Sequence, residues 1–150
     1  MISTNSFNIY NASAGTGKTF SLVRDYLCLL LNSNNYELYK NILAITFTNK
    51  AVNEMKGRIV KYLISYSSSV DTDLIMLKEI SKKTGLSKKE IFLKSSIILK
   101  NLLKNYSAFE ISTIDKLTQK IVRNFTYELG IDSKYEVEID QNEIINRAVD

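Results

Sequence analysis

Apolar residues recur at helical spacing in two long stretches of the chain. The first stretch begins at Lys18 and stops at the Asn-Ser-Asn-Asn segment 32–35, and it predicts a helix whose apolar positions are Phe20, Val23, Leu27, Leu30 and Leu31. The second stretch predicts a helix that begins near Asn49 and gathers on one face Val52, Met55, Ile59, Val60, Leu63 and Ile64.

Short apolar segments between the helical stretches predict strands. Residues 7–10 alternate apolar and polar, whereas residues 42–47 form a nearly continuous apolar run. Such a run is typical of a strand buried on both faces in a parallel sheet. Residues 109–112 and 135–139 are two further candidates. Because these strands alternate with helices, the sequence favours an α/β fold with a parallel sheet flanked by helices.

Residues 67–108 predict a helical insert made of two helices. Asp71 or Thr72 is expected to cap the first helix, and Gly85 is expected to follow its last residue. The segment Ser87–Glu90 has the spacing of a capping box for the second helix. The apolar positions of that helix are Ile91, Phe92, Ile98, Leu99, Leu102 and Leu103. Its lysines are expected to form a solvated face: Lys88, Lys89, Lys94, Lys100 and Lys104.

Another helix is predicted after the third strand. Thr113 is placed to cap it, and Asp115 lies in its first turn, where the helix dipole favours an anion. This helix is expected to continue through Leu129 and to end at Gly130. Near the end of the printed sequence, Asp140 is expected to cap one more helix.

Composition excludes several kinds of chemistry. The 150 residues contain no His and one Cys, so catalytic triads with His, His-ligated zinc and an internal disulfide are excluded. Cys28 is expected to be a buried, reduced thiol. The longest apolar run, residues 26–31, is much shorter than the ~20 residues of a membrane span. Since no secretory signal begins at Met1, we expect a soluble, cytoplasmic protein without membrane contact.

Charge is distributed unevenly along the sequence. Residues 1–130 contain 18 basic and 10 acidic residues, whereas residues 131–150 contain 2 basic and 6 acidic residues. The excess of basic residues in 1–130 suggests that this part of the chain has an anionic partner. On charge alone, a solvated lysine-rich surface is the favoured interpretation.

Residues 12–19, Ala-Ser-Ala-Gly-Thr-Gly-Lys-Thr, match the phosphate-loop pattern G-x-x-x-x-G-K-[ST] except that Ala12 replaces the first glycine. The segment lies between a predicted strand and a predicted helix, which is the context that the motif requires. The alternative is a glycine-containing turn that happens to precede Lys-Thr.

The residue types in this loop suit the binding of a nucleoside triphosphate. Gly15 and Gly17 allow the backbone to wrap tightly around a phosphate. The N–H groups of Ala14–Thr19 would form an anion-binding nest at the start of a helix. Lys18 can reach the β- and γ-phosphates, and the Thr19 hydroxyl can ligate Mg²⁺.

A second candidate site follows the apolar run at residues 42–47. Residues 45–59 place an aromatic side chain, hydroxyls, an amide and a cation at the carboxyl end of a strand, where ligands bind in open α/β sheets. This combination can stack a base and bind a phosphate. The alternative is an ordinary loop in which Thr48 caps the next helix and Phe47 packs inside.

Three segments together resemble the UvrD/Rep-type superfamily 1 DNA helicases. Residues 12–20 look like motif I of that family, and residues 46–59 resemble motif Ia closely. Residues 112–115, Ser-Thr-Ile-Asp, resemble the next motif, written T-F-H or T-I-H. The insert at 67–108 points to the RecB/AddA branch, whose members act in helicase–nuclease complexes. The resemblance covers about residues 7–150.

This resemblance implies a P-loop NTPase fold of the RecA type that uses ATP and Mg²⁺. It implies phosphate binding by Gly15, Thr16, Gly17, Lys18 and Thr19. It also implies contacts with single-stranded DNA at Thr46, Phe47, Thr48, Asn49, Thr113 and Ile114. Asp115 stands where the family often has His, and we do not expect this acid to contact DNA phosphates.

The resemblance further implies the organisation of the chain. Residues 1–139 would be the N-terminal part of the first RecA-like ATP-binding domain, and residues 140–150 would begin an inserted helical subdomain. The activity implied is 3′–5′ translocation on single-stranded DNA in recombination or repair, with an attached nuclease domain or a partner subunit. The acids that bind Mg²⁺ in this family lie further downstream, so these 150 residues alone are expected to bind nucleotide weakly and to hydrolyse little.

Other interpretations stay open at the level of sequence. Asp115 is a weak internal candidate for the metal-binding acid, because it follows a predicted strand. A nucleotide kinase would need a phosphate acceptor site and clustered arginines, yet arginine occurs only at positions 24, 58, 123 and 147. A non-catalytic DNA-binding or scaffold module that keeps the motor fold is the other alternative.

Overall fold

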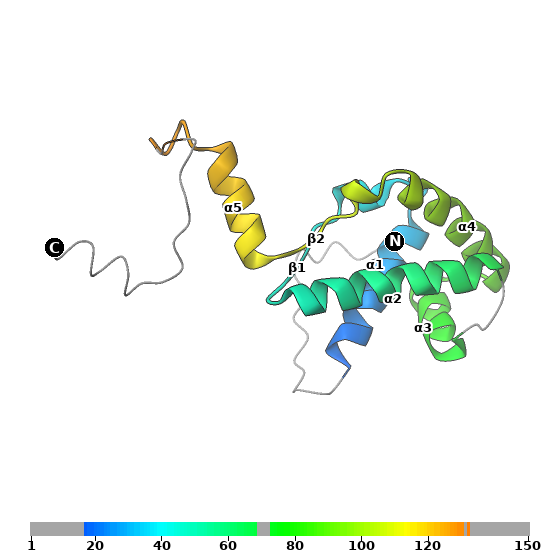
Figure 1. Cartoon of the computed structure of the whole chain (residues 1–150). Helices are drawn as coiled ribbons and strands as arrows, with labels where there is room; N and C mark the ends of the chain where they lie inside the picture. The colour runs from blue at the N-terminus through cyan, green and yellow to red at the C-terminus, as the bar shows by residue number, and fades with distance from the viewer. Residues whose placement is uncertain (1–16, 69–72, 131, 133–150) are drawn as a thin grey trace. The chain divides into compact units, whose positions relative to one another are not determined.

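The computed structural model describes residues 17–68, 73–130 and 132 as an α/β protein in which helices predominate. The chain divides into two units, residues 1–113 and 114–150. The first unit contains the following elements in order (Figure 1): α1 (Lys18–Asn32), η1 (Leu38–Asn41), β1 (Ala44–Thr46), α2 (Asn49–Ser68), α3 (Leu74–Thr84), α4 (Lys88–Lys104), η2 (Tyr106–Ala108) and β2 (Ile111–Thr113). The second unit contains α5 (Ile114–Asn124).

Strands β1 and β2 pair in parallel, as the alternation of helices and strands predicts. Ala44 is opposite Ile111, and Thr46 is opposite Thr113. Both strands are three residues long, so they are shorter than the apolar runs that predicted them. The sequence predicts that β1 is buried on both faces. This prediction is wrong, since Ile45 of β1 is 46% exposed. The sheet has two strands within the described ranges.

The core of the first unit lies where α1, α2 and α4 meet. Helices α2 and α4 run side by side in Figure 1 and share the most extensive interface of the unit. The predicted apolar face of α2 is largely confirmed: Met55, Ile59 and Leu63 are buried, although Ile64 is 48% exposed. The fully buried side chains from α1 and α4 include Val23, Leu27, Leu31, Ile91, Ile98 and Leu102.

Local capping chemistry defines both helices of the predicted insert. Gly85 follows α3 with a φ of 74°, and its N–H donates to the Ser81 carbonyl at 2.8 Å, as predicted. The Ser87–Glu90 capping box at the start of α4 is confirmed. The expected cap at Asp71 or Thr72 was wrong. Asp73 is the N-cap instead, because its carboxylate accepts from the N–H groups at positions 75 and 76 at 3.0 and 3.1 Å.

The second unit begins with α5, which is shorter than the sequence predicts. The helix ends at Asn124 rather than at Leu129, and turns follow it. Beyond the end of the helix, the Thr126 hydroxyl donates to the Arg123 carbonyl at 3.4 Å. Gly130 closes the turns with a φ of 65°. The predicted strands at 7–10 and 135–139 and the helix expected from Asp140 lie outside the described residues.

Lys94 of α4 caps the C-terminus of α1 and is not part of a solvated face. Its Nζ donates to the Leu31 carbonyl at 2.8 Å and to the Ser33 carbonyl at 3.2 Å. Helix α1 has no basic residue in its own last turn. Lys94 therefore supplies the positive charge that the negative end of the α1 dipole favours, and it joins α4 to α1.

Substituting Lys94 by Gln should lower the free energy of unfolding by about 1 kcal/mol, because two carbonyl groups lose a charged hydrogen-bond donor. Lys100→Gln is the matched control, since Lys100 lies exposed on the same helix. Urea denaturation followed by circular dichroism measures both variants. Equal midpoints for the two variants would contradict the capping role.

Candidate nucleotide and DNA sites

Helix α1 begins at the position that the phosphate-loop motif predicts. Gly17 is its N-cap and has a φ of 80°, a left-handed conformation that favours glycine. Lys18 is exposed and Thr19 is half-buried at the start of the helix. The first turn contains no acidic residue and receives no hydrogen bond from a capping side chain. Ala14, Gly15 and Thr16, the other predicted phosphate-binding residues, lie outside the described residues.

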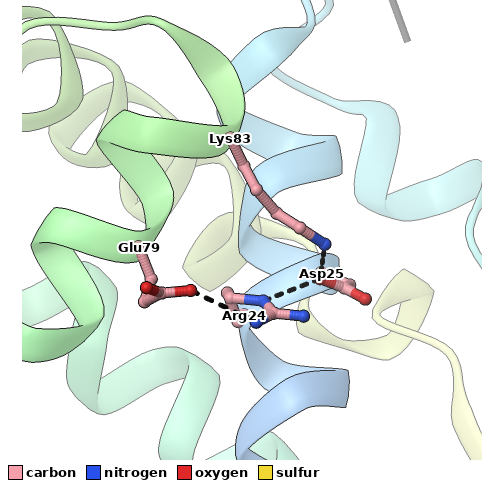
Figure 2. A network of polar contacts seen from close by, with 4 residues as sticks. All are labelled: Arg24, Asp25, Glu79 and Lys83. Carbon is pink, nitrogen blue, oxygen red and sulfur yellow. Dashed lines mark hydrogen bonds and ion pairs between the residues drawn. The ribbon is translucent and has the colours of Figure 1, made fainter. Parts of the chain in front are cut away.

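Polar contacts of α1 fix this helix to α3, one of the helices of the predicted insert. Figure 2 shows that Arg24 lies between Asp25 of its own helix and Glu79 of α3. The Arg24 guanidinium donates to Asp25 at 2.9 Å and to Glu79 at 3.3 Å, and Lys83 donates to Asp25 at 2.6 Å. The side chains of Arg24 and Asp25 are 14% and 24% exposed, so water screens these pairs less than fully exposed ones. The sequence pattern of either helix alone does not reveal this network.

Phe47 lies in solvent at the carboxyl end of β1. Its side chain is 85% exposed, so the interpretation in which it packs inside is wrong. The interpretation of Thr48 as a helix cap is confirmed, since its hydroxyl accepts from the Ala51 N–H at 3.1 Å. Thr46 donates its hydroxyl to the Thr48 carbonyl at 3.2 Å. These two hydrogen bonds hold the backbone on either side of Phe47, and Asn49 is exposed beside them.

The predicted DNA-contacting residues at the end of β2 differ in exposure. Thr113 is 4% exposed, and its backbone lies opposite that of Thr46 in the sheet. Ile114, the next residue along the chain, is 46% exposed. The sheet therefore brings Thr113 to the same end as Thr46, while its side chain is largely withdrawn from solvent.

The described residues do not support Asp115 as a strand-end metal ligand. Strand β2 ends at Thr113, and Asp115 is the second residue of α5. Within the described ranges, no three His, Cys, Asp or Glu side chains lie close enough together to hold a metal ion.

None of the described helices is long and apolar enough to span a membrane.

Lys56 of α2 has a structural contact that the motif pattern does not reveal. Its Nζ lies 5.5 Å from the ring centroids of both Tyr106 and Phe109. This pair of cation–π contacts holds the segment that leads into β2 against α2. Close by in the core, the rings of Tyr26 and Phe109 meet edge to face with centroids 5.8 Å apart.

Burial controls the ionisation of Cys28 on α1. Loss of solvent raises the pKa of the Cys28 thiol to about 11, and the charges of Lys83 and Asp25 have smaller, opposing effects. The thiolate is the reactive form of cysteine, so this shift makes Cys28 inert at neutral pH. Cys28 is a free thiol, but it is half-buried and not fully buried as the sequence predicts.

At pH 8 the native chain should react with iodoacetamide about 100-fold more slowly than the chain unfolded in guanidinium, because a pKa near 11 leaves little thiolate. The native rate should rise with pH up to about 11. Mass spectrometry at timed intervals measures modification of the single cysteine. Equal rates for the native and unfolded chains at pH 8 would contradict the shift.

Comparison with known proteins identifies relatives of this chain. The family model of the UvrD/REP helicase N-terminal domain matches residues 2–150. RecBCD enzyme subunit RecB of Buchnera aphidicola is 32% identical over 155 residues, which are 95% of this chain and 12% of that protein. An ATP-dependent helicase/nuclease subunit of Streptococcus uberis is 31% identical over 143 residues, 95% of this chain and 10% of that protein.

A third relative matches a shorter segment at higher identity. RecBCD enzyme subunit RecB of Chlamydia muridarum is 56% identical over 52 residues, 35% of this chain and 5% of that protein. The chain spans about a tenth of the length of the first two relatives. No solved structure matches the chain.

Proposed function

The chain belongs to the UvrD/REP helicase N-terminal domain family, and we propose that it forms the ATP-binding and DNA-gripping part of a 3′–5′ DNA helicase motor. The observation that carries the proposal is the exposed Phe47 at the carboxyl end of β1. A phenylalanine that is 85% exposed contributes little to the core, but it offers a flat face on which a base can stack. The helicase role in recombination or repair follows from the family and from the RecB relatives.

The nucleotide part of the proposal assigns the phosphates of ATP to Ala14–Thr19. It is supported by the positive φ of Gly17 and by the start of α1 at Lys18. Lys18 would place its charge on the β- and γ-phosphates, and the Thr19 hydroxyl would ligate Mg²⁺. Both side chains reach solvent at the helix terminus, and a hydroxyl oxygen is a ligand type that suits this hard cation.

The DNA part of the proposal assigns single-stranded DNA to the carboxyl end of the sheet. Phe47 would stack a base, while Thr46, Thr48, Asn49, Thr113 and Ile114 would line the path of the strand. Thr113 is only 4% exposed. It would therefore contribute to DNA binding through its backbone, or by positioning Ile114. In the complete motor, ATP binding would close two RecA-like domains on the DNA, and hydrolysis would reopen them.

The proposed place in the larger protein is the first RecA-like domain. Residues 1–139 would belong to that P-loop domain, with the helical insert at 67–108, and residues 140–150 would begin an inserted subdomain. One relative is named as a helicase/nuclease subunit, and another is named as a subunit of the RecBCD enzyme. We propose a similar arrangement for this chain, with an attached nuclease domain or a partner subunit in the cytoplasm.

Substituting Lys18 by Ala should abolish binding of a fluorescent ATP analogue, because the phosphates lose their main cationic partner. Binding of labelled oligothymidylate should persist and should weaken with added salt, as phosphate contacts require. Lys89→Ala, an exposed lysine of α4, is the control and should leave both affinities unchanged. Unaltered nucleotide affinity in the Lys18 variant would exclude the phosphate-loop assignment.

The same titrations distinguish a motor from a DNA-binding scaffold. A scaffold would bind the oligonucleotide and would show no nucleotide affinity even with Lys18 intact. Phosphate release is a second readout, since these 150 residues are expected to bind nucleotide without robust hydrolysis. Strong DNA-stimulated ATPase activity from this chain alone would contradict that expectation.

Substituting Phe47 by Ala should weaken oligothymidylate binding by about 1–3 kcal/mol, because one stacking platform is lost. Phe47→Tyr should retain the affinity, since the aromatic face remains. Leu93→Ala, which removes an apolar side chain that is 65% exposed on α4, is the control for general loss of exposed apolar surface. Fluorescence anisotropy measures all three variants, and equal affinities for Phe47→Ala and the wild type would exclude stacking at this site.

A further inference from the structure

Phe47 lies in a very short link between two regular elements. Strand β1 ends at Thr46 and helix α2 begins at Asn49, so Phe47 and Thr48 are the two residues that connect them. The chain bends at Phe47, and the side chain there is 85% exposed. Contacts with the core therefore contribute little to fixing the direction in which this ring points.

Hydrogen bonds of two threonine side chains hold this link. The Thr46 hydroxyl donates to the Thr48 carbonyl at 3.2 Å, which ties the residue before Phe47 to the residue after it. The same carbonyl accepts from the Val52 N–H at 3.1 Å. The Thr48 hydroxyl accepts from the Ala51 N–H at 3.1 Å, as an N-cap residue does. Since Thr46 belongs to β1 and Thr48 caps α2, the link is anchored on both sides of Phe47.

These bonds limit what the two hydroxyls can offer to DNA. A hydroxyl has one hydrogen to donate, and Thr46 donates its hydrogen to the Thr48 carbonyl. The ionised oxygens of a phosphate backbone accept hydrogen bonds, so Thr46 has no hydrogen left for them while the link keeps this conformation. The Thr48 hydroxyl is an acceptor in its bond to the Ala51 N–H and keeps its own hydrogen. A direct phosphate contact is therefore the competing role for Thr48.

A link that is ordered before DNA arrives favours binding. Fixing a residue costs conformational entropy, and a site that must order its contact residue during association loses that part of its affinity. We propose that Thr46 and Thr48 are positioning residues, which hold Phe47 in the orientation in which its ring stacks on a base of single-stranded DNA. This inference rests on the proposed DNA-binding function, and it gives the two hydroxyls a role other than contact with the strand.

The main test removes each hydroxyl with a change that nearly keeps the shape of the side chain. Thr46→Val and Thr48→Val are made in the full chain, both with and without Phe47→Ala. Thr84→Val is the matched control, because the Thr84 hydroxyl donates to the Ile80 carbonyl at 2.8 Å in α3, outside the proposed DNA site. Anisotropy titrations of labelled oligothymidylate are run at low salt, where phosphate contacts keep the binding of the Phe47→Ala chain measurable.

Each hydroxyl variant should bind the oligonucleotide about 3- to 10-fold more weakly than the wild type, because the link must then be ordered during binding. In the Phe47→Ala chain the same two changes should alter the affinity by less than about 2-fold, since a residue that acts through Phe47 has nothing left to position. Thr46→Ser and Thr48→Ser keep the hydroxyls and should bind as the wild type does. Thr84→Val should also keep the wild-type affinity.

A second measurement follows the order at position 47 in the absence of DNA. The sequence contains no tryptophan, so Phe47→Trp provides a single indole at this position. The fast local motion of this indole, measured by time-resolved fluorescence anisotropy, should increase when Thr46→Val or Thr48→Val is added. Thr84→Val should leave the motion unchanged. Unchanged motion in the two hydroxyl variants would overturn the inference without reference to DNA affinity.

The outcomes separate this inference from the function on which it rests. If the hydroxyl variants lose the same affinity with and without Phe47, the hydroxyls act independently of the ring, and the inference alone is overturned. Hydroxyl variants that bind as tightly as the wild type overturn it as well. If the wild type does not bind the oligonucleotide at all, both the function and the inference are overturned. If Thr48→Val loses helical circular dichroism, Thr46→Val decides, because that variant leaves the cap of α2 in place.

Discussion

The parallel register of β1 and β2 is the constraint on which the candidate DNA site depends. Pairing of Thr46 with Thr113 brings two segments that are far apart in the sequence to the same end of a sheet. Parallel strands cannot be joined by a tight turn, so a long crossover must connect them. Here the crossover consists of α2, α3, α4 and η2. The exposed Phe47 and the start of α5 follow from where these two strands end.

The helical insert is part of the core and not an appendage. Ile91, Ile98 and Leu102 of α4 are fully buried, and α4 packs along α2. The same helix supplies Lys94 to the C-terminus of α1. Helix α3 is joined to α1 by the Arg24 network. The predicted insert therefore holds α1, the helix that follows the proposed phosphate loop. Such support would matter for the proposed site, since a binding group at a helix terminus must be held in place.

Local chemistry could be predicted from the sequence, whereas long-range contacts could not. The cap at Gly85 and the Ser87–Glu90 box depend on neighbouring residues, and both were predicted correctly. Lys94 was predicted as part of a solvated face because its partners are carbonyl groups of another helix. The burial of β1 was predicted wrongly because an apolar run does not reveal what covers it. For the site, the motifs predicted the start of α1, but the solvent exposure of Phe47 required the structure.

The two ends of α1 differ in how their partial charges are satisfied. At the C-terminus, Lys94 donates to two carbonyl groups and neutralises the negative end of the dipole. At the N-terminus, Gly17 provides no capping side chain and the first turn contains no acid. The positive end is thus the one left without a compensating charge from the described residues of α1. A bound anion is stabilised at such a terminus, and the positive φ of Gly17 favours the tight backbone path that phosphate binding needs. The proposed placement of the ATP phosphates therefore follows from the electrostatics of a single helix as well as from its motif.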